Sequence, residues 1–138
     1  MVGQSKEKLE WGDLETFEAL GFKLGRPEIT ISGTAKTFTL SSGFVRRAKK
    51  QIANNTHAVL SFSKQNEAIV FEFIDRPDAP GAIKMTKGAN ITISGTSFFN
   101  YNTLNPGELK GKYTPELHNI SKKGNCWVIF LGKKKPVQ

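Results

Sequence analysis

The sequence predicts a β-rich α+β domain, in which two duplicated ββαββ units form a small barrel with pseudo-twofold symmetry. Short segments alternate β-branched or aromatic residues with polar ones, which is typical of half-buried strands. The order strand, strand, short helix, hairpin occurs twice, in residues of about 28–75 and 82–131. Each unit is too small to bury its own apolar face, so we expect the two to pair within one domain of residues 28–132.

A repeated hexapeptide at first suggests a different duplication. The letters ITISGT stand at residues 29–34 and again at 91–96, but an offset of this size aligns little else. An offset near 54 matches the other strands better and, with a one-residue gap, aligns Phe38–Ser41 with Ile91–Ser94. The two copies of the hexapeptide therefore belong to different strands of their units.

The first unit is predicted from four segments. Strands are expected at about 28–32 and 37–41, followed by a short helix from Ser42, where a serine side chain can cap the free backbone N–H groups. Four apolar residues share one face of this helix: Phe44, Val45, Ala48 and Ile52. The hairpin arms HAVLSFS and AIVFEFI follow, turned at KQNE.

The second unit repeats this order less regularly. Its strands are AIKMT and NITIS, its helix or helical turn is TSFFNYNTL, and its hairpin arms are KYTPELHNI and CWVIFL. Pro115 lies inside the first arm and cannot donate a backbone hydrogen bond, so this arm is expected at a sheet edge or with a bulge. The turn-rich DRPDAPG links the units.

The two ends of the chain differ in charge from the body. Residues 1–27 form an acidic N-terminal segment with a predicted short helix, capped by Asp13, that covers a sheet edge or lies over the basic face. Residues 133–138 are expected to be a disordered basic tail. No apolar run is long enough to span a bilayer and no secretory signal is recognisable, so we expect a soluble, cytoplasmic protein without membrane contact.

The order strand, tight turn, strand ending at a helix N-cap, short helix and further strand resembles the AbrB-like swapped-hairpin and double-psi barrel proteins. The resemblance covers about residues 28–131 and is one of pattern. Where AbrB-like sequences usually have Gly-Arg before the second strand, this chain has Ala35-Lys36 and Ala89-Asn90. Members of this group pair two such units by dimerisation or duplication, and the resemblance implies a DNA-binding role.

Positive charge is concentrated outside the N-terminus. The chain carries a net charge of +8, and residues 1–22 hold five acids and two lysines, which leaves +11 on the remainder. The densest cluster is SSGFVRRAKKQI, where Arg46, Arg47, Lys49 and Lys50 must point outward because the apolar face is buried. No acid lies between Lys36 and Lys64. Mobile cations on a rigid element suit phosphate binding, although a solvated helix face is the alternative.

Aromatic residues offer a second means of binding nucleic acid. In FFNY, Tyr101 is the best candidate for an exposed ring on which a base could stack, whereas Phe98 and Phe99 are expected in the core. The other basic sets, Lys110 with Lys112 and Lys122 with Lys123, are ordinary for loops and edge strands.

Residues for catalysis or metal binding are few. His57, His118 and the single Cys126 do not stand at motif spacing, and Asp75 and Asp78 belong to a turn. No phosphate-binding loop or HExxH motif is present, so no enzyme activity, cofactor or metal is predicted.

The sequence therefore predicts a small non-enzymatic protein, monomeric or homodimeric, that binds nucleic acid through phosphates. Arg46, Arg47, Lys49 and Lys50 would be the principal contacts and Lys36 a flanking one. One alternative is an accessory module whose basic face binds an acidic protein partner. Another is a small-ligand or catalytic barrel with a pocket near His57 or His118.

Overall fold

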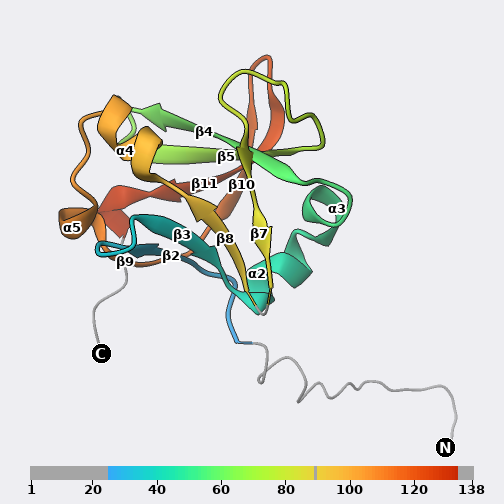
Figure 1. Cartoon of the computed structure of the whole chain (residues 1–138), viewed down its shortest axis with the longest axis horizontal. Coiled ribbons are helices and arrows are strands. Elements are labelled where there is room, and N and C mark those ends of the chain that lie inside the picture. The colour runs from blue at the N-terminus through green and yellow to red at the C-terminus, as the bar shows by residue number, and fades with distance from the viewer. Residues whose placement is uncertain (1–24, 89, 134–138) are drawn as a thin grey trace, which may run out of the picture.

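The computed structural model describes residues 25–88 and 90–133, which form two antiparallel five-stranded sheets and a few short helices (Figure 1). The first sheet has the strand order β10-β11-β5-β4-β6, and the second sheet β7-β8-β3-β2-β9. The strands of the first unit are β2 (Ile29–Ser32), β3 (Thr37–Leu40), β4 (His57–Ser63) and β5 (Ala68–Ile74). Those of the second are β6 (Ile83–Lys84), β7 (Thr86–Lys87), β8 (Ile91–Ser94), β9 (Gly111–Tyr113), β10 (Glu116–Ile120) and β11 (Gly124–Phe130).

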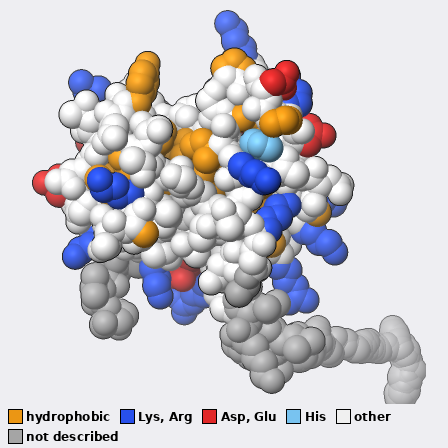
Figure 2. Space-filling model, viewed as in Figure 1, with side chains coloured by type: hydrophobic (Ala, Val, Ile, Leu, Met, Phe, Trp, Pro, Cys, Tyr) orange, Lys and Arg blue, Asp and Glu red, His pale blue; other side chains and the backbone are white. Residues whose placement is uncertain are grey.

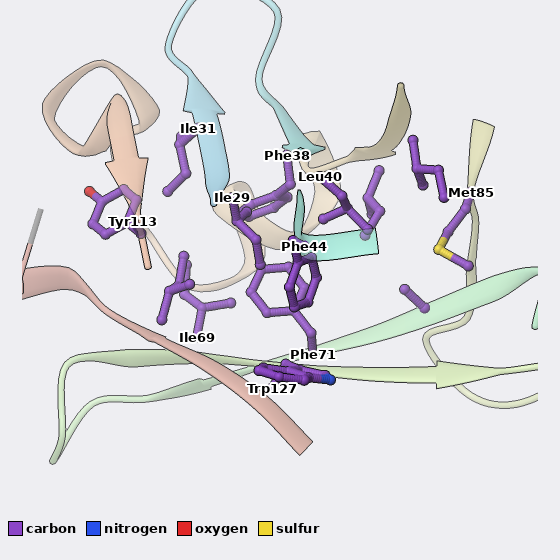
Figure 3. Close-up of a cluster of buried hydrophobic side chains, with 14 of the residues drawn as sticks. Ile29, Ile31, Phe38, Leu40, Phe44, Ile69, Phe71, Met85, Tyr113 and Trp127 are labelled. Atoms are coloured by element: carbon purple, nitrogen blue, oxygen red, sulfur yellow. The ribbon is translucent and has the colours of Figure 1, made fainter. Parts of the chain in front are cut away.

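The core lies between the two sheets, as the alternation along their strands requires. Figure 3 shows Ile29, Ile31, Phe38 and Leu40 of the second sheet pointing toward Ile69, Phe71 and Trp127 of the first. The ring of Phe38 meets the ring of Phe71 edge-on at a centroid distance of 5.3 Å. A smaller apolar cluster, made by Ala68, Val70, Cys126 and Val128, lies on the outer face of the first sheet.

The chain passes from one sheet to the other at three places, the first of which is the helical segment between β3 and β4. Between β6 and β7 only Met85 intervenes, and its buried side chain joins the core while its backbone N–H donates to the Thr56 carbonyl. Between β9 and β10 the chain passes through Thr114 and Pro115. Pro115 interrupts the predicted arm, and β10 is an edge strand, as expected.

The predicted closed barrel is not found among the described strands. At Met85 the chain changes partner from β4 in the first sheet to β8 in the second, and β6 and β7 have only two residues each. The hydrogen-bonded ladder is interrupted there, so two sheets result. The β-rich α+β class predicted from the sequence is confirmed, whereas duplication of the two units is not shown.

The predicted helices are shorter than their apolar faces suggested. The first is broken at Ala48 into α2 (Ser42–Arg47) and α3 (Lys49–Ile52), and Phe44, Ala48 and Ile52 remain on the buried side. In the second unit α4 (Thr96–Tyr101) is followed by an unpredicted α5 (Pro106–Leu109), and the short 3-10 helix η2 (Leu131–Lys133) follows β11. Among the described residues, none of the helices has the length and apolar character that crossing a membrane requires.

Two predicted features fall mainly outside the described residues. The acidic N-terminal helix with Asp13 as its cap lies entirely there, as do residues 134–138 of the predicted basic tail. Lys133, the first residue of that tail, lies in η2, where its Nζ is 4.9 Å from the centre of the Phe130 ring and 3.5 Å from Glu116 Oε2.

Candidate nucleic-acid interface

Helices α2 and α3 carry the predicted cations, and a serine cap and three buried side chains hold them in place. The Oγ of Ser41 accepts a hydrogen bond from the backbone N–H of Phe44 at 3.1 Å, which satisfies one free donor of the first turn of α2. Phe44, Ala48 and Ile52 then bury the inner side of the two helices. The remaining side is directed outward.

The chain enters the described domain against the start of α2. Ser41 Oγ also donates to the Arg26 carbonyl at 2.8 Å and accepts from the N–H of Glu28 at 2.9 Å. Gly43 allows this approach, because a Cβ there would lie 2.6 Å from the Gly25 carbonyl oxygen. The acidic residues 1–22 are therefore attached, in sequence, directly before a segment that touches the basic helix.

Arg46, Arg47, Lys49 and Lys50 are all exposed, as predicted. None of the four forms an ion pair with another residue in the part of the chain that the structure describes. Figure 2 shows Lys and Arg side chains gathered on the side of the molecule where α2 and α3 lie in Figure 1. The electrostatic repulsion among the four cations is offset in part because Arg46 and Arg47 lie in the last turn of α2. Positive charge there interacts favourably with the negative end of the helix dipole.

These four cations border one groove, which we call the basic groove. It has a volume of about 490 Å³ and is lined by Arg46, Arg47, Lys49, Lys50, Gln51, Leu117 and Trp127. Leu117 and Trp127 face each other across the β10–β11 ladder, so the sheet supplies the floor and the helices supply the charged wall. Leu117 is 47% exposed, unusual for a large apolar residue in this protein.

Trp127 is fixed at the floor of the basic groove. Its indole is only 5% exposed and stands edge-on to Phe44, with ring centroids 5.0 Å apart and planes at 88°. Among the described residues, the buried Nε1–H has no hydrogen-bond partner. An unsatisfied buried donor costs about 1–3 kcal/mol, so an acceptor that reached it would be favoured.

The groove continues beyond Gln51 and Trp127 into a smaller hollow of about 170 Å³. Asn55, Lys123 and Asn125 also line this hollow. The side-chain oxygen of Asn125 accepts a hydrogen bond from Asn119 at 3.1 Å, and Lys123 pairs with Glu72 at 3.2 Å. Side-chain amide groups therefore lie next to the cations, between α3 and β11.

A further cation, Lys87, extends the positive surface on the other side of the helices. Together with Arg46 and Lys49 it lines a second hollow of about 450 Å³. Its Nζ donates to the Asn55 carbonyl at 2.8 Å, close to the C-terminal end of α3. The sequence offered no signal for Lys87, because its position depends on the pairing of β7 with β8.

Lys36 does not join this cluster. It lies in the turn between β2 and β3 with a φ of 57°, at the opposite end of β3 from the start of α2. The four residues of β3 separate it from Ser41, and these five residue steps span roughly 16 Å. Its carbonyl accepts from the N–H of Gly95, which places it beside α4 instead.

The remaining candidates for chemistry stay apart. No group of three or more His, Cys, Asp or Glu residues that could hold a metal occurs within residues 25–88 and 90–133. His118 lies 3.3 Å from Glu116 and its ring packs on Phe130, whereas His57 bonds its neighbour Thr56. Burial, followed by the negative charge of Glu72, raises the pKa of the Cys126 thiol, and Lys123 opposes this effect. The thiol is therefore not activated.

A second groove lies beside α4, and it carries no charged residue in its lining. This neutral groove has a volume of about 610 Å³ and is lined by Leu60, Ser61, Phe62, Gly81, Ala82, Ile83, Ser97, Phe98, Tyr101 and Asn102. Tyr101 is 88% exposed, while Phe98 and Phe99 are buried, as the sequence predicted.

The basic groove is the feature that distinguishes this fold chemically. It can bind anions through four mobile cations and can offer an apolar floor and amide groups beside them. The resemblance to AbrB-like proteins stays a prediction. No protein-family model matches the chain, and no similar curated protein or solved structure was found.

Proposed function

We propose that this protein binds nucleic acid, with Arg46, Arg47, Lys49 and Lys50 contacting phosphates along the basic groove. The observation that carries the proposal is that these four exposed cations border a single groove and have no acidic partner among the described residues. Each cation that meets a phosphate releases a condensed counterion, which makes such binding favourable and salt-dependent. Lys87 would extend the contact, and Lys36 would reach the same strand only on a longer ligand.

The pairing of the strands supports the finer description of the fold, in which the two units are duplicated and related by a pseudo-twofold axis. Thr39 pairs with Thr92 at the centre of the β3–β8 ladder. In the sequence alignment of the two units, Phe38 is equivalent to Ile91 and Leu40 to Ile93. A twofold relation that exchanges the units therefore requires that the pair Phe38–Ile93 be matched by a pair Leu40–Ile91, and both pairs are present. The same exchange relates the β2–β9 pairing to the β6–β4 pairing.

Under this exchange helix α2, which borders the basic groove, corresponds to helix α4, which borders the neutral groove. Helices α2 and α4 each have six residues, and the final pair Arg46-Arg47 of α2 corresponds to Asn100-Tyr101 of α4. The two helices therefore differ sharply in charge at their C-terminal ends. A positive charge that served only solubility has no reason to be confined to one of them, so the asymmetry favours an anionic ligand at the basic groove.

Salt-dependent binding tests the proposal directly. Fluorescence anisotropy of labelled DNA and RNA, titrated with the full chain between about 50 and 200 mM salt, should give affinities that fall steeply with salt. Absence of binding at the lowest salt would contradict the proposal.

We further propose that the protein works in the cytoplasm, as a monomer or a homodimer.

An acidic protein partner is the second candidate, and the edge strand β10 favours it. Leu117 of this strand lines the basic groove beside the four cations, and one edge of the strand is unpaired within the described sheet, so an extended acidic segment could add to it. Binding to acidic proteins or heparin, combined with indifference to nucleic acid, would support this candidate instead.

A further inference from the structure

We propose that the basic groove receives single-stranded nucleic acid, with the backbone along the cations and an unstacked base above Leu117 and Trp127. This inference rests on the proposed function and narrows its ligand class. The shared chemistry is that of a flexible polyanion with exposed bases, which single-stranded DNA and single-stranded RNA both provide.

The first argument is the mixed lining of the groove. Phosphate contact alone needs only cations, yet here the half-exposed Leu117 lines the groove with them and Trp127 forms the floor. In a duplex the bases are stacked inside, and phosphate contacts leave them out of reach of such a floor. A single strand can turn a base toward apolar side chains while its phosphates remain on the cations.

The second argument is the shape of the helical element. Duplex recognition commonly places an exposed helix in the major groove. Here α2 has six residues, α3 has four, and the chain bends at Ala48 between them. Their inner side is buried by Phe44 and Ile52, so they form the wall of a groove and do not protrude as a recognition helix.

The third argument is the supply of hydrogen-bonding groups at the floor. The Nε1–H of Trp127 is buried and unpartnered within the described residues, and a base edge carries acceptors that suit it. Because Nε1 is covered, an acceptor reaches it only when neighbouring side chains move aside. Gln51 and Asn125 offer amides in the adjoining hollow.

The experiment uses the full chain with the substitution Trp11→Phe, which leaves Trp127 as the only tryptophan. Probes are fluorescein-labelled oligo-dT and oligo-U of about 15 nucleotides, close to the upper end of single-strand site sizes, and a duplex of the same length. Anisotropy gives the affinities, and Trp127 emission reports on the floor of the groove. The dT and U arms distinguish DNA from RNA.

We expect a single strand to bind about tenfold more tightly than the duplex and to change Trp127 emission. Leu117→Ala should weaken single-strand binding by about threefold to tenfold and leave duplex binding unchanged, because only an inserted base uses this side chain. Leu60→Ala, the same exchange at a half-buried leucine of the neutral groove, is the matched control and should change neither affinity. Trp127→Phe should also weaken single-strand binding, with thermal unfolding checked because the residue is buried.

Two failures are distinguishable. Equal affinity for single strand and duplex, with Trp127 emission unchanged, would contradict the insertion of a base into the groove. The proposal of phosphate binding would still stand. Absence of binding to all three probes would overturn the proposed function itself. If Leu117→Ala folds normally and binds the single strand with unaltered affinity, the proposal that a base contacts Leu117 in this groove would also be contradicted.

Discussion

Phe44 of α2 stands edge-on to Trp127 of β11, with ring centroids 5.0 Å apart and ring planes at 88°. This contact joins the helix that carries the cations to the floor of the basic groove. The wall and the floor are thereby held at a fixed separation. Phe44 is fully buried, so a substitution at this residue would change the packing under the groove without removing a contact with the ligand.

Phe44→Ala should lower the free energy of unfolding by about 3–5 kcal/mol, because it leaves a cavity beneath α2 and removes the aromatic contact. Urea denaturation measures this loss. Val45→Ala is the matched control, since Val45 is only half-buried on the same helix and should cost clearly less. Equal losses for the two variants would show that Phe44 does not anchor the helix.

Replacing Arg46 and Arg47 together by glutamine should weaken binding to every nucleic-acid sequence. Each arginine neutralises one phosphate, so the slope of log affinity against log salt should become shallower by about two units. The control exchanges Lys64 and Lys112 for glutamine, which removes the same charge from exposed positions outside the basic groove. Equal effects of both pairs would indicate general electrostatic attraction without a defined site.

Ser41→Ala should lower the free energy of unfolding by about 1–2 kcal/mol. The side chain caps α2 at Phe44 and also ties the entering chain through Arg26 and Glu28, so several polar groups lose their partner at once. The neighbouring Ser42 is exposed, and within residues 25–88 and 90–133 its side chain makes no hydrogen bond, so Ser42→Ala should have little effect. Thermal and urea unfolding of the two variants make the comparison.

Deletion of residues 1–22 should tighten binding and raise the association rate at low salt, because it removes a net charge of −3 attached close to the basic helix. The effect should shrink as salt screens the charges. Stopped-flow association with labelled single strand measures it. Weaker binding after deletion would mean that the N-terminal segment contributes contacts of its own.

Cys126 should remain protonated in the folded protein at pH values where a free thiol ionises, since burial and Glu72 raise its pKa. Only the unfolded chain then loses this proton, so the stability falls as the pH rises above the ordinary thiol pKa. Urea midpoints at roughly pH 7 and pH 9.5 should therefore fall more in the wild type than in Cys126→Ala. Ellman's reagent should react slowly with the folded protein and fully in urea.

Local patterns were sufficient to predict the strands and the hairpin of the first unit and the buried face of α2, whereas the predicted strand AIKMT and the predicted arm KYTPELHNI are each divided between the two sheets. Alternation identifies β2 and β3 because each of these strands buries one side, and Phe44, Ala48 and Ile52 share a helical face. Local patterns could not distinguish two sheets from a closed barrel. That difference depends on where Met85 moves the chain between sheets, and thus on pairings between distant residues.

The candidate site was predicted only in part for the same reason. The four cations of α2 and α3 were identified from charge density and from the apolar face that directs them outward. Lys36 seemed adjacent because it lies near them in sequence, but an extended strand separates it from α2. Leu117 and Trp127 became part of the groove only through the β10–β11 ladder, which brings the last strands of the chain against a helix near its beginning.

The way in which the sheets combine early and late strands also determines when the protein can fold during synthesis. The second sheet is complete only when β9 pairs with β2, which joins Tyr113 to Ile29, and the first only when β11 enters between β5 and β10. A nascent chain that ends before Phe130 lacks a complete β11 to pair with β5, and the face of β5 that carries Ile69 and Phe71 is exposed. The ribosome must therefore release the chain at least through β11 before a stable domain exists, and chains stalled earlier become substrates for chaperones or proteases.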